Sequence, residues 1–158
     1  MNILVKYHNK NCDLVQHGNW IDLKSSENVK FKKFENKLIP LGISIRLPKY
    51  YQANIVPRSG TYKNYSLIQA NHYGVVDGPD DNSGGYSGNN DIWMFNAIAL
   101  KETEINVGDR ICQFEIRLTM KTPWYVKLKW FFDNKIRFIE VNDLMSKNRG
   151  GFGSTGQK

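Results

Sequence analysis

Short runs of alternating apolar and polar residues, interrupted every few positions by Gly, Pro, Asn or Asp, constrain the fold of this chain most. Alternation with a period of two places every second side chain on one face of a strand, and the interrupting residues favour turns. Many short strands joined by turns predict an all-β domain, built as a sandwich, a barrel or a jelly roll. The strands are expected at Ile3–Tyr7, Leu38–Leu47, Ala53–Pro57, Ile92–Leu100 and Arg110–Ile116.

A single folded domain fits the size and composition of the chain. Its 158 residues are 41% hydrophobic and 23% charged, which is ordinary for a globular protein. Neither a repeat nor a linker divides it, and only Thr61–Gln69 is suited to a short helix. No apolar run approaches the ~18 residues of a transmembrane helix, and the N-terminus lacks a signal-peptide pattern, so we expect a cytoplasmic protein without a membrane partner.

Charge and cysteine content narrow the choice of partner only slightly. A net charge of +7 suits an anionic ligand such as a nucleotide, a phosphate or a nucleic acid. The lysines are spread along the chain, however, which favours a solvated surface over stable nucleic-acid binding. Cys12 and Cys112 offer neither a disulfide framework nor a zinc-site spacing, and the apolar neighbours of Cys112 predict its burial.

Two segments have the character of insertions. Gly78–Gly85 consists of turn-forming residues and is expected to bulge outward as a surface loop. In Trp124–Val141, apolar residues alternate with lysines before a turn at Asp133-Asn134, which predicts a β-hairpin with one aromatic and one basic face. Such a hairpin can bind single-stranded nucleic acid, or it can pack on the core or on a neighbouring subunit.

The C-terminal residues combine backbone freedom with groups that bind nucleotides. Four glycines within Arg149–Gly156 disfavour helix and strand. The same segment carries an arginine, an aromatic ring and two hydroxyl groups, which suit phosphates and a base. A disordered Gly/Ser tail also explains this composition, whereas a P-loop does not, because no helix follows. We expect a mobile arm at 149–158 that follows a domain at 1–148.

Polar residues also gather at the ends of predicted strands. Pro57-Arg58-Ser59-Gly60 places a guanidinium and a hydroxyl beside a glycine, as in small anion-binding turns. Asp77 ends an apolar stretch and can act as a general base, position a water or cap the next turn. The small residues of Tyr86–Trp93 predict a tight hairpin with an exposed backbone.

Taken in order, these segments match one family. From about residue 18 to its end, the chain resembles the trimeric dUTP diphosphatases (dUTPases), most closely those of Gram-positive bacteria and their phages. It departs from the family in Trp20, where glycine is usual, in a longer spacing between Asp77 and Tyr86, and in extra residues near 124–134. The five motifs are Trp20-Ile21-Asp22-Leu23, Pro57-Arg58-Ser59-Gly60, Gly74-Val75-Val76-Asp77 with Tyr86-Ser87-Gly88, Gly108-Asp109-Arg110-Ile111-Cys112-Gln113, and Arg149-Gly150-Gly151-Phe152-Gly153-Ser154-Thr155-Gly156.

The resemblance implies a distorted jelly-roll homotrimer with shared active sites that hydrolyses dUTP to dUMP and pyrophosphate, with Mg²⁺ held mainly by the substrate phosphates. Asp77 is implied to activate the attacking water, and Asp22 to contact the metal through water and to pair with Arg110. The implied substrate-binding residues are Arg58, Ser59, Gly60 and Gln113 for phosphates, Asn71, Val75, Val76, Tyr86 and Asp91 for the nucleoside, and Arg149, Phe152, Gly153, Ser154 and Thr155 from the arm. In this family the arm usually crosses to another subunit, and the sequence leaves open which subunit each arm reaches.

Three other functions remain open from the residues. A phage dUTPase can act as a regulatory factor that binds a host protein through inserted segments, here 78–85 or 124–134. A dCTP deaminase shares the fold, although no deaminating glutamate is evident in the sequence. A β-barrel that binds nucleic acid would fit the charge and the aromatic residues, and it requires salt-sensitive binding to a single-stranded oligonucleotide.

Overall fold

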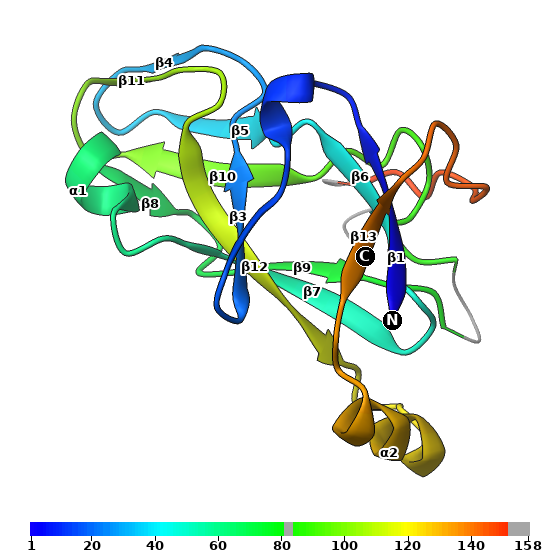
Figure 1. The fold of residues 1–158 in the computed structure, drawn as a ribbon. Coiled ribbons are helices and arrows are strands. Elements are labelled where there is room, and N and C mark those ends of the chain that lie inside the picture. The colour runs from blue at the N-terminus through cyan, green and yellow to red at the C-terminus, as the bar shows by residue number, and fades with distance from the viewer. Residues whose placement is uncertain (81–83, 152–158) are drawn as a thin grey trace, which may run out of the picture.

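The chain folds into short strands arranged in four sheets, as Figure 1 shows in a computed structural model that describes residues 1–80 and 84–151. The largest sheet contains, in spatial order, β2 (Val15–His17), β3 (Trp20–Lys24), β12 (Arg110–Leu118), β7 (Tyr51–Pro57) and β9 (Gly74–Asp77). The other sheets are β13 (Arg137–Glu140), β1 (Asn2–Tyr7) and β6 (Ile43–Arg46); β5 (Asn36–Pro40), β10 (Met94–Ala99) and β8 (Leu67–Gln69); and β11 (Thr103–Ile105) with β4 (Val29–Phe31).

The sheets enclose one apolar core. Along β10, the buried residues Phe95, Ala97 and Ala99 alternate with partly exposed neighbours, as the period of a strand requires. The rings of Trp93 and Phe114 meet edge to face in the core, with centroids 5.0 Å apart. Cys112 is buried as predicted, and burial raises the pKa of its thiol. The all-β fold class is therefore confirmed.

The five predicted strand segments are confirmed, although one of them contains two strands. Leu38–Leu47 is divided at Gly42 into β5 and β6, because the chain turns there with φ 65°, a conformation that favours glycine. Glycine is also required by close packing, since a Cβ atom at position 42 would lie 2.8 Å from the Cys12 sulfur. The expected short helix is α1 (Thr61–Tyr65), and a short 3₁₀ helix, η1, spans Lys10–Cys12. The strands that were not predicted, such as β8 and β9, are too short to show a clear alternation.

The hairpin predicted for Trp124–Val141 is wrong. The structure instead contains helix α2 (Trp124–Phe132), and the strand that follows it, β13, pairs in parallel with β1. The carbonyl of Pro123 accepts hydrogen bonds from the amides of Val126 and Lys127, so the helix begins directly after this proline.

Residues four apart explain why α2 is a helix. Val126 and Trp130 lie on the same helix face and pack against the core, where the Trp130 ring meets Tyr51 at a centroid distance of 5.4 Å. The alternating sequence fits this spacing as well as it fits a strand, so periodicity alone cannot separate the two structures.

The remaining surface of α2 faces solvent. Figure 1 shows the helix extending from the body of the domain beyond the end of β12. The side chains of Trp124, Phe131 and Phe132 are 74%, 78% and 77% exposed. Across the described residues, no helix combines the length and the hydropathy needed to span a membrane.

Candidate active site

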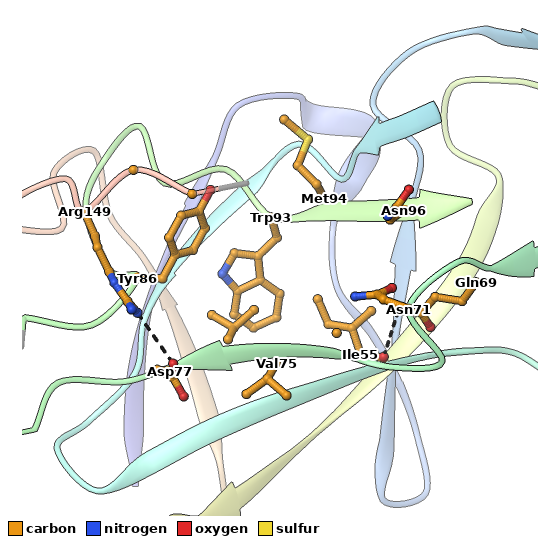
Figure 2. Close-up of a pocket in the computed structure, with 14 residues that line it drawn as sticks. Ile55, Gln69, Asn71, Val75, Asp77, Tyr86, Trp93, Met94, Asn96 and Arg149 are labelled. Atoms are coloured by element: carbon orange, nitrogen blue, oxygen red, sulfur yellow. Dashed lines mark hydrogen bonds and ion pairs between the residues drawn. The ribbon is translucent and has the colours of Figure 1, made fainter. Parts of the chain in front are cut away.

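A pocket of about 250 Å³ lies between β9, β10 and the beginning of the C-terminal arm (Figure 2). This volume is slightly below the ~300–1,000 Å³ range that is typical of ligand sites. The predicted site residues that line it are Asn71, Val75, Val76, Asp77, Tyr86 and Arg149. The lining residues that the sequence did not predict are Ile55, Gln69, Gly74, Trp93, Met94, Asn96, Gly150 and Gly151.

A carboxylate and a guanidinium meet at one end of the pocket. The Arg149 side chain lies 3.5 Å from an Asp77 oxygen, and the Asp77 side chain is 54% exposed. An exposed carboxylate can orient a water molecule and accept its proton, whereas a guanidinium binds phosphate oxygens. This end of the pocket therefore has the groups needed to hydrolyse a phosphate ester or anhydride.

Tyr86 lies in the pocket wall, next to the beginning of the arm. Its hydroxyl donates a hydrogen bond to the Ile92 carbonyl at 2.9 Å, and burial, with the nearby Asp91 charge, raises the pKa of Tyr86, so the phenol stays protonated. The backbone of Gly151 lies against its ring: a Cβ atom at this position would come within 2.9 Å of a ring carbon. Only glycine lets the arm approach Tyr86 this closely.

The side chain of Asp91 connects the predicted hairpin to the arm. Tyr86–Trp93 contains a tight turn, in which the Asp91 amide donates to the Gly88 carbonyl at 3.1 Å, but no strand, so the expected hairpin geometry is wrong. The buried Asp91 carboxylate accepts hydrogen bonds from the amides of Gly88 (2.8 Å), Arg149 (3.0 Å) and Gly150 (3.0 Å). These bonds hold the arm where Arg149 can reach Asp77.

The loop that begins at Gly78 has a narrow base, the neck, where Asp77 and Gly78 lie against Gly85 and Tyr86. The Tyr86 amide donates to the Asp77 carbonyl at 2.8 Å, so the two residues stay adjacent despite the long insertion between them. Gly85 has φ 71°, and a Cβ atom on it would lie 2.4 Å from the carbonyl carbon of Gly78. The neck therefore requires glycine at position 85. Residues 81–83 lie outside the described part of the loop.

The predicted phosphate-binding residues form a second group. Asp22 is 4% exposed and accepts hydrogen bonds from Arg58 Nε at 2.8 Å and from the Arg110 guanidinium at 3.2 Å. Gln113 lies opposite Asp22 in the pairing of β12 with β3, and its side-chain amide is 3.5 Å from the Pro57 carbonyl. The exposed Ser59 follows Arg58 in the same turn.

The two groups of predicted residues are separate within one chain. Neither Asp22 and the arginines around it, nor Ser59, Gly60 or Gln113, contribute to the described lining of the pocket. A single chain thus presents the pocket and, elsewhere, the turn that carries the predicted phosphate-binding residues. Phe152, Gly153, Ser154 and Thr155 lie outside the described residues, so their predicted contacts stay predictions.

The acidic residues that the structure describes do not form a metal-binding cage of their own. Within residues 1–80 and 84–151, no group of three or more His, Cys, Asp or Glu side chains is arranged to hold a metal ion. Both oxygens of the Asp22 carboxylate are already engaged by guanidinium groups. This donor set fits a cation held chiefly by the phosphate oxygens of a ligand, with the protein in contact through water.

The fold and the site define an all-β protein with a carboxylate–guanidinium pair at the mouth of a nucleoside-sized pocket. The dUTPase family model matches residues 20–127. The chain is 44% identical to the SPbeta prophage-derived deoxyuridine 5'-triphosphate nucleotidohydrolase YosS of Bacillus subtilis (strain 168), with 100% of both chains covered. It is 32% identical to the deoxyuridine 5'-triphosphate nucleotidohydrolase of Leifsonia xyli, over 85% of this chain and 77% of that protein. The chain belongs to the dUTPase family.

Solved structures agree with this assignment at the level of the fold. The dUTPase of Staphylococcus bacteriophage 80alpha, solved with dUPNHPP, superposes with a TM-score of 0.63 at 19% identity and covers 98% of each chain. The dUTPase of Streptococcus mutans gives a TM-score of 0.61 at 18% identity over 74% of this chain and 93% of that one.

Proposed function

We propose that the protein hydrolyses dUTP to dUMP and pyrophosphate. The observation that carries this proposal is the meeting of Asp77, Tyr86 and Arg149 at the mouth of one pocket. The full-length relative at 44% identity, a deoxyuridine 5'-triphosphate nucleotidohydrolase, supports the choice of substrate. The reaction keeps uracil out of DNA and supplies dUMP for thymidylate synthesis. We therefore propose that the protein acts in the cytoplasm, where the precursors of DNA are made.

In the proposed reaction, Asp77 accepts a proton from a water whose oxygen attacks the α-phosphorus. The bond from the α-phosphorus to the bridging oxygen breaks in line with this attack, and pyrophosphate leaves. Arg149, which pairs with Asp77 in the free chain, turns to the γ-phosphate when the substrate is bound. When bound to the substrate phosphates, Mg²⁺ would neutralise part of their charge, and the Asp22 carboxylate would contact the water molecules around the ion.

The pocket is proposed to hold the nucleoside. The Tyr86 ring lies against the deoxyribose and leaves no room for a 2′-hydroxyl, while main-chain groups of the turn around Asp91 face uracil. Asn71, Val75 and Val76 supply the opposite wall. A buried donor or acceptor left without a partner by the wrong base costs about 1–3 kcal/mol, which is enough to favour uracil over cytosine.

A homotrimer with shared sites is proposed because one chain does not bring its two groups of residues together. In the trimer, Arg58, Ser59, Gly60 and Gln113 of one subunit bind phosphates at the pocket of another. Mixed trimers of Asp77→Asn and Ser59→Ala chains are then expected to recover activity that neither parent has, because some sites take both intact halves. No recovery after verified subunit exchange would place both groups in one chain's site.

Isotope labelling tests the proposed reaction. Hydrolysis of dUTP in ¹⁸O-labelled water is expected to place the label in dUMP, since the water attacks the α-phosphorus. Label in pyrophosphate would mean attack on the β-phosphorus and would rule out the proposed geometry.

Gly85→Ala is expected to lower kcat/KM for dUTP by about 10²-fold, because the strained φ and the contact with Gly78 push Tyr86 out of position. Steady-state kinetics measures this loss, with Gly84→Ala as the matched control, since a Cβ atom at position 84 meets nothing within 4 Å. Equal activity of the two variants would contradict the role of the neck.

A regulatory factor is the alternative function, and the full-length relative at 44% identity, named as a nucleotidohydrolase, does not favour it. Structures of the Staphylococcus bacteriophage 80alpha dUTPase are described in terms of control over the transfer of virulence genes, and this is a property of that protein. For the present chain, binding of a host protein through 78–85 or 124–134 stays a hypothesis.

A further inference from the structure

The side-chain hydroxyl of Thr61, the first residue of α1, joins two parts of the chain that are distant in the sequence. Thr61 is 1% exposed. Its Oγ1 accepts a hydrogen bond from the Arg58 amide at 2.9 Å and donates one to the Ile111 carbonyl at 2.7 Å. A hydroxyl has a single proton and a carbonyl can only accept, so the directions of both bonds are fixed. The hydroxyl therefore connects the turn that carries the predicted phosphate-binding residues to β12.

On the side of the turn, Thr61 binds both polar groups of the Arg58 backbone. Its own amide donates to the Arg58 carbonyl at 3.0 Å, while its hydroxyl accepts from the Arg58 amide. Ser59 and Gly60 lie between these two bonds along the chain, and the Ser59 side chain is exposed. The conformation in which the turn presents Ser59 to a ligand therefore depends on Thr61.

On the side of β12, the bond from Thr61 reaches a β-bulge. The pairing of β12 with β3 shifts between Arg110 and Cys112, so the bulge leaves Ile111 without a counterpart on β3. The pairing of β12 with β7 begins only at Cys112. Ile111 is buried, and a buried carbonyl without a hydrogen-bond donor destabilises the fold. The Thr61 hydroxyl supplies a donor at this position, directly after Arg110.

The two segments that Thr61 connects hold the same carboxylate. Asp22 accepts hydrogen bonds from Arg58 Nε at 2.8 Å and from the Arg110 guanidinium at 3.2 Å. The Arg58 guanidinium also donates to the Arg110 carbonyl at 3.2 Å. The Thr61 hydroxyl thus fixes the backbone beside both arginines. Phosphate oxygens are bound through hydrogen bonds of defined geometry, so the relative placement of these groups matters for a phosphate ligand.

We propose that Thr61 is a positioning residue whose hydroxyl holds the turn at 58–60 in the geometry that binds the phosphates of dUTP. This inference rests on the proposed hydrolysis of dUTP. Because Thr61 is buried, it acts through the turn and not by contact with the substrate. Removal of the hydroxyl takes away the bonds of the Arg58 amide and of the Ile111 carbonyl, so the turn can move away from β12. Affinity for the phosphates then falls more than affinity for the nucleoside.

The test compares Thr61→Val with Thr61→Ser in the full-length protein. Valine keeps the size and branching of threonine and removes the hydroxyl, whereas serine keeps the hydroxyl. Calorimetric titration measures the binding of the non-hydrolysable α,β-imido analogue of dUTP and of dUMP, which carries a single phosphate. We expect Thr61→Val to bind the dUTP analogue about tenfold more weakly and dUMP almost as well as the wild type. Thr61→Ser should restore the affinity for the analogue to within about twofold of the wild type.

The matched control is Thr122→Val, which makes the same change at another buried threonine. Thr122 is 5% exposed and lies beyond the other end of β12, where its hydroxyl donates to the Thr119 carbonyl at 2.7 Å. Both valine variants are expected to unfold at a lower temperature than the wild type, because each loses a buried hydrogen bond. Thr122→Val should bind the dUTP analogue normally. Equal weakening by the two variants would contradict a specific role of Thr61.

Equal losses for the dUTP analogue and for dUMP would overturn the proposal, since they would indicate a general distortion of the site. Unchanged binding of the analogue by Thr61→Val, or failure of Thr61→Ser to restore it, would overturn the proposal too. If Thr61→Val does not fold, Thr61→Cys replaces it, because a thiol forms only weak hydrogen bonds. Thr61→Cys should then bind the analogue more weakly than Thr61→Ser and bind dUMP equally well. Equal affinity of these two variants for the analogue would contradict the assignment.

The inference and the function can fail separately. A wild-type protein that neither binds nor hydrolyses dUTP would refute the proposed function. A wild-type protein that hydrolyses dUTP, together with Thr61→Val that keeps its affinity for the analogue, would refute only the role of Thr61.

Discussion

Asp77→Asn is expected to lower kcat for dUTP by about 10³-fold or more, because asparagine cannot accept the proton of the attacking water. Nucleotide binding should persist, since the remainder of the pocket is unchanged and asparagine has the size of aspartate. Loss of kcat with an unchanged Kd for the α,β-imido analogue separates a chemical role of Asp77 from a role in binding. Stopped assays of pyrophosphate release and calorimetric titration give the two quantities.

The control for this substitution is Asp133→Asn, which makes the same chemical change at an exposed position directly after α2. It is expected to keep wild-type activity. Near-normal turnover by Asp77→Asn would remove Asp77 from its proposed role and leave the pocket without its general base.

A chain that ends at Asn148 is expected to lose about 10²–10³-fold in kcat/KM, because it lacks Arg149 and the groups that follow it. The domain should stay folded. The segment before the arm is held independently by the buried Leu144, whose amide donates to the Asn89 side chain at 2.9 Å and whose carbonyl accepts from Arg46 at 3.1 Å. Kinetics, elution volume and thermal unfolding of the truncated chain check these expectations.

Arg149→Gln in the full-length chain separates two contributions of the arm: the charge of the Arg149 guanidinium, and the closure of the arm over the base. If the guanidinium is the main contribution of the arm, this variant should reproduce most of the loss. If closure over the base matters more, its loss should be small beside that of the truncation. Full activity of the truncated chain would contradict any catalytic role of the arm.

The sequence was most informative where a residue's neighbours along the chain determine its structure. Strands such as β7 and β10 follow from alternation, and Asp77 and Tyr86 were assigned to one site although an insertion separates them. The structure shows how they remain adjacent: the Tyr86 amide bonds to the Asp77 carbonyl across the neck. Gly85 allows this contact, and its close approach to Gly78 cannot be predicted from turn composition alone.

The sequence was less informative where long-range contacts decide. The Asp91 carboxylate accepts a hydrogen bond from the Arg149 amide, which lies 58 residues away in the sequence. No pattern near Asp91 in the sequence could therefore predict that this carboxylate holds the arm. Gln69 lies in a strand of three residues, and only tertiary structure shows that its amide nitrogen bonds to Ile55 while its buried oxygen has no hydrogen-bond partner among the described residues. The sequence of α2 is compatible with a strand and with a helix, and the packing of Trp130 on Tyr51 favours the helix.

The most direct test of the account is Mg²⁺-dependent release of pyrophosphate from dUTP, measured beside dCTP, dTTP and UTP. We expect rapid turnover of dUTP alone, because in the proposed complex Tyr86 excludes ribose and the turn around Asp91 recognises uracil. A folded protein that is inactive on all four nucleotides, or that hydrolyses UTP or dCTP as well as dUTP, would contradict it.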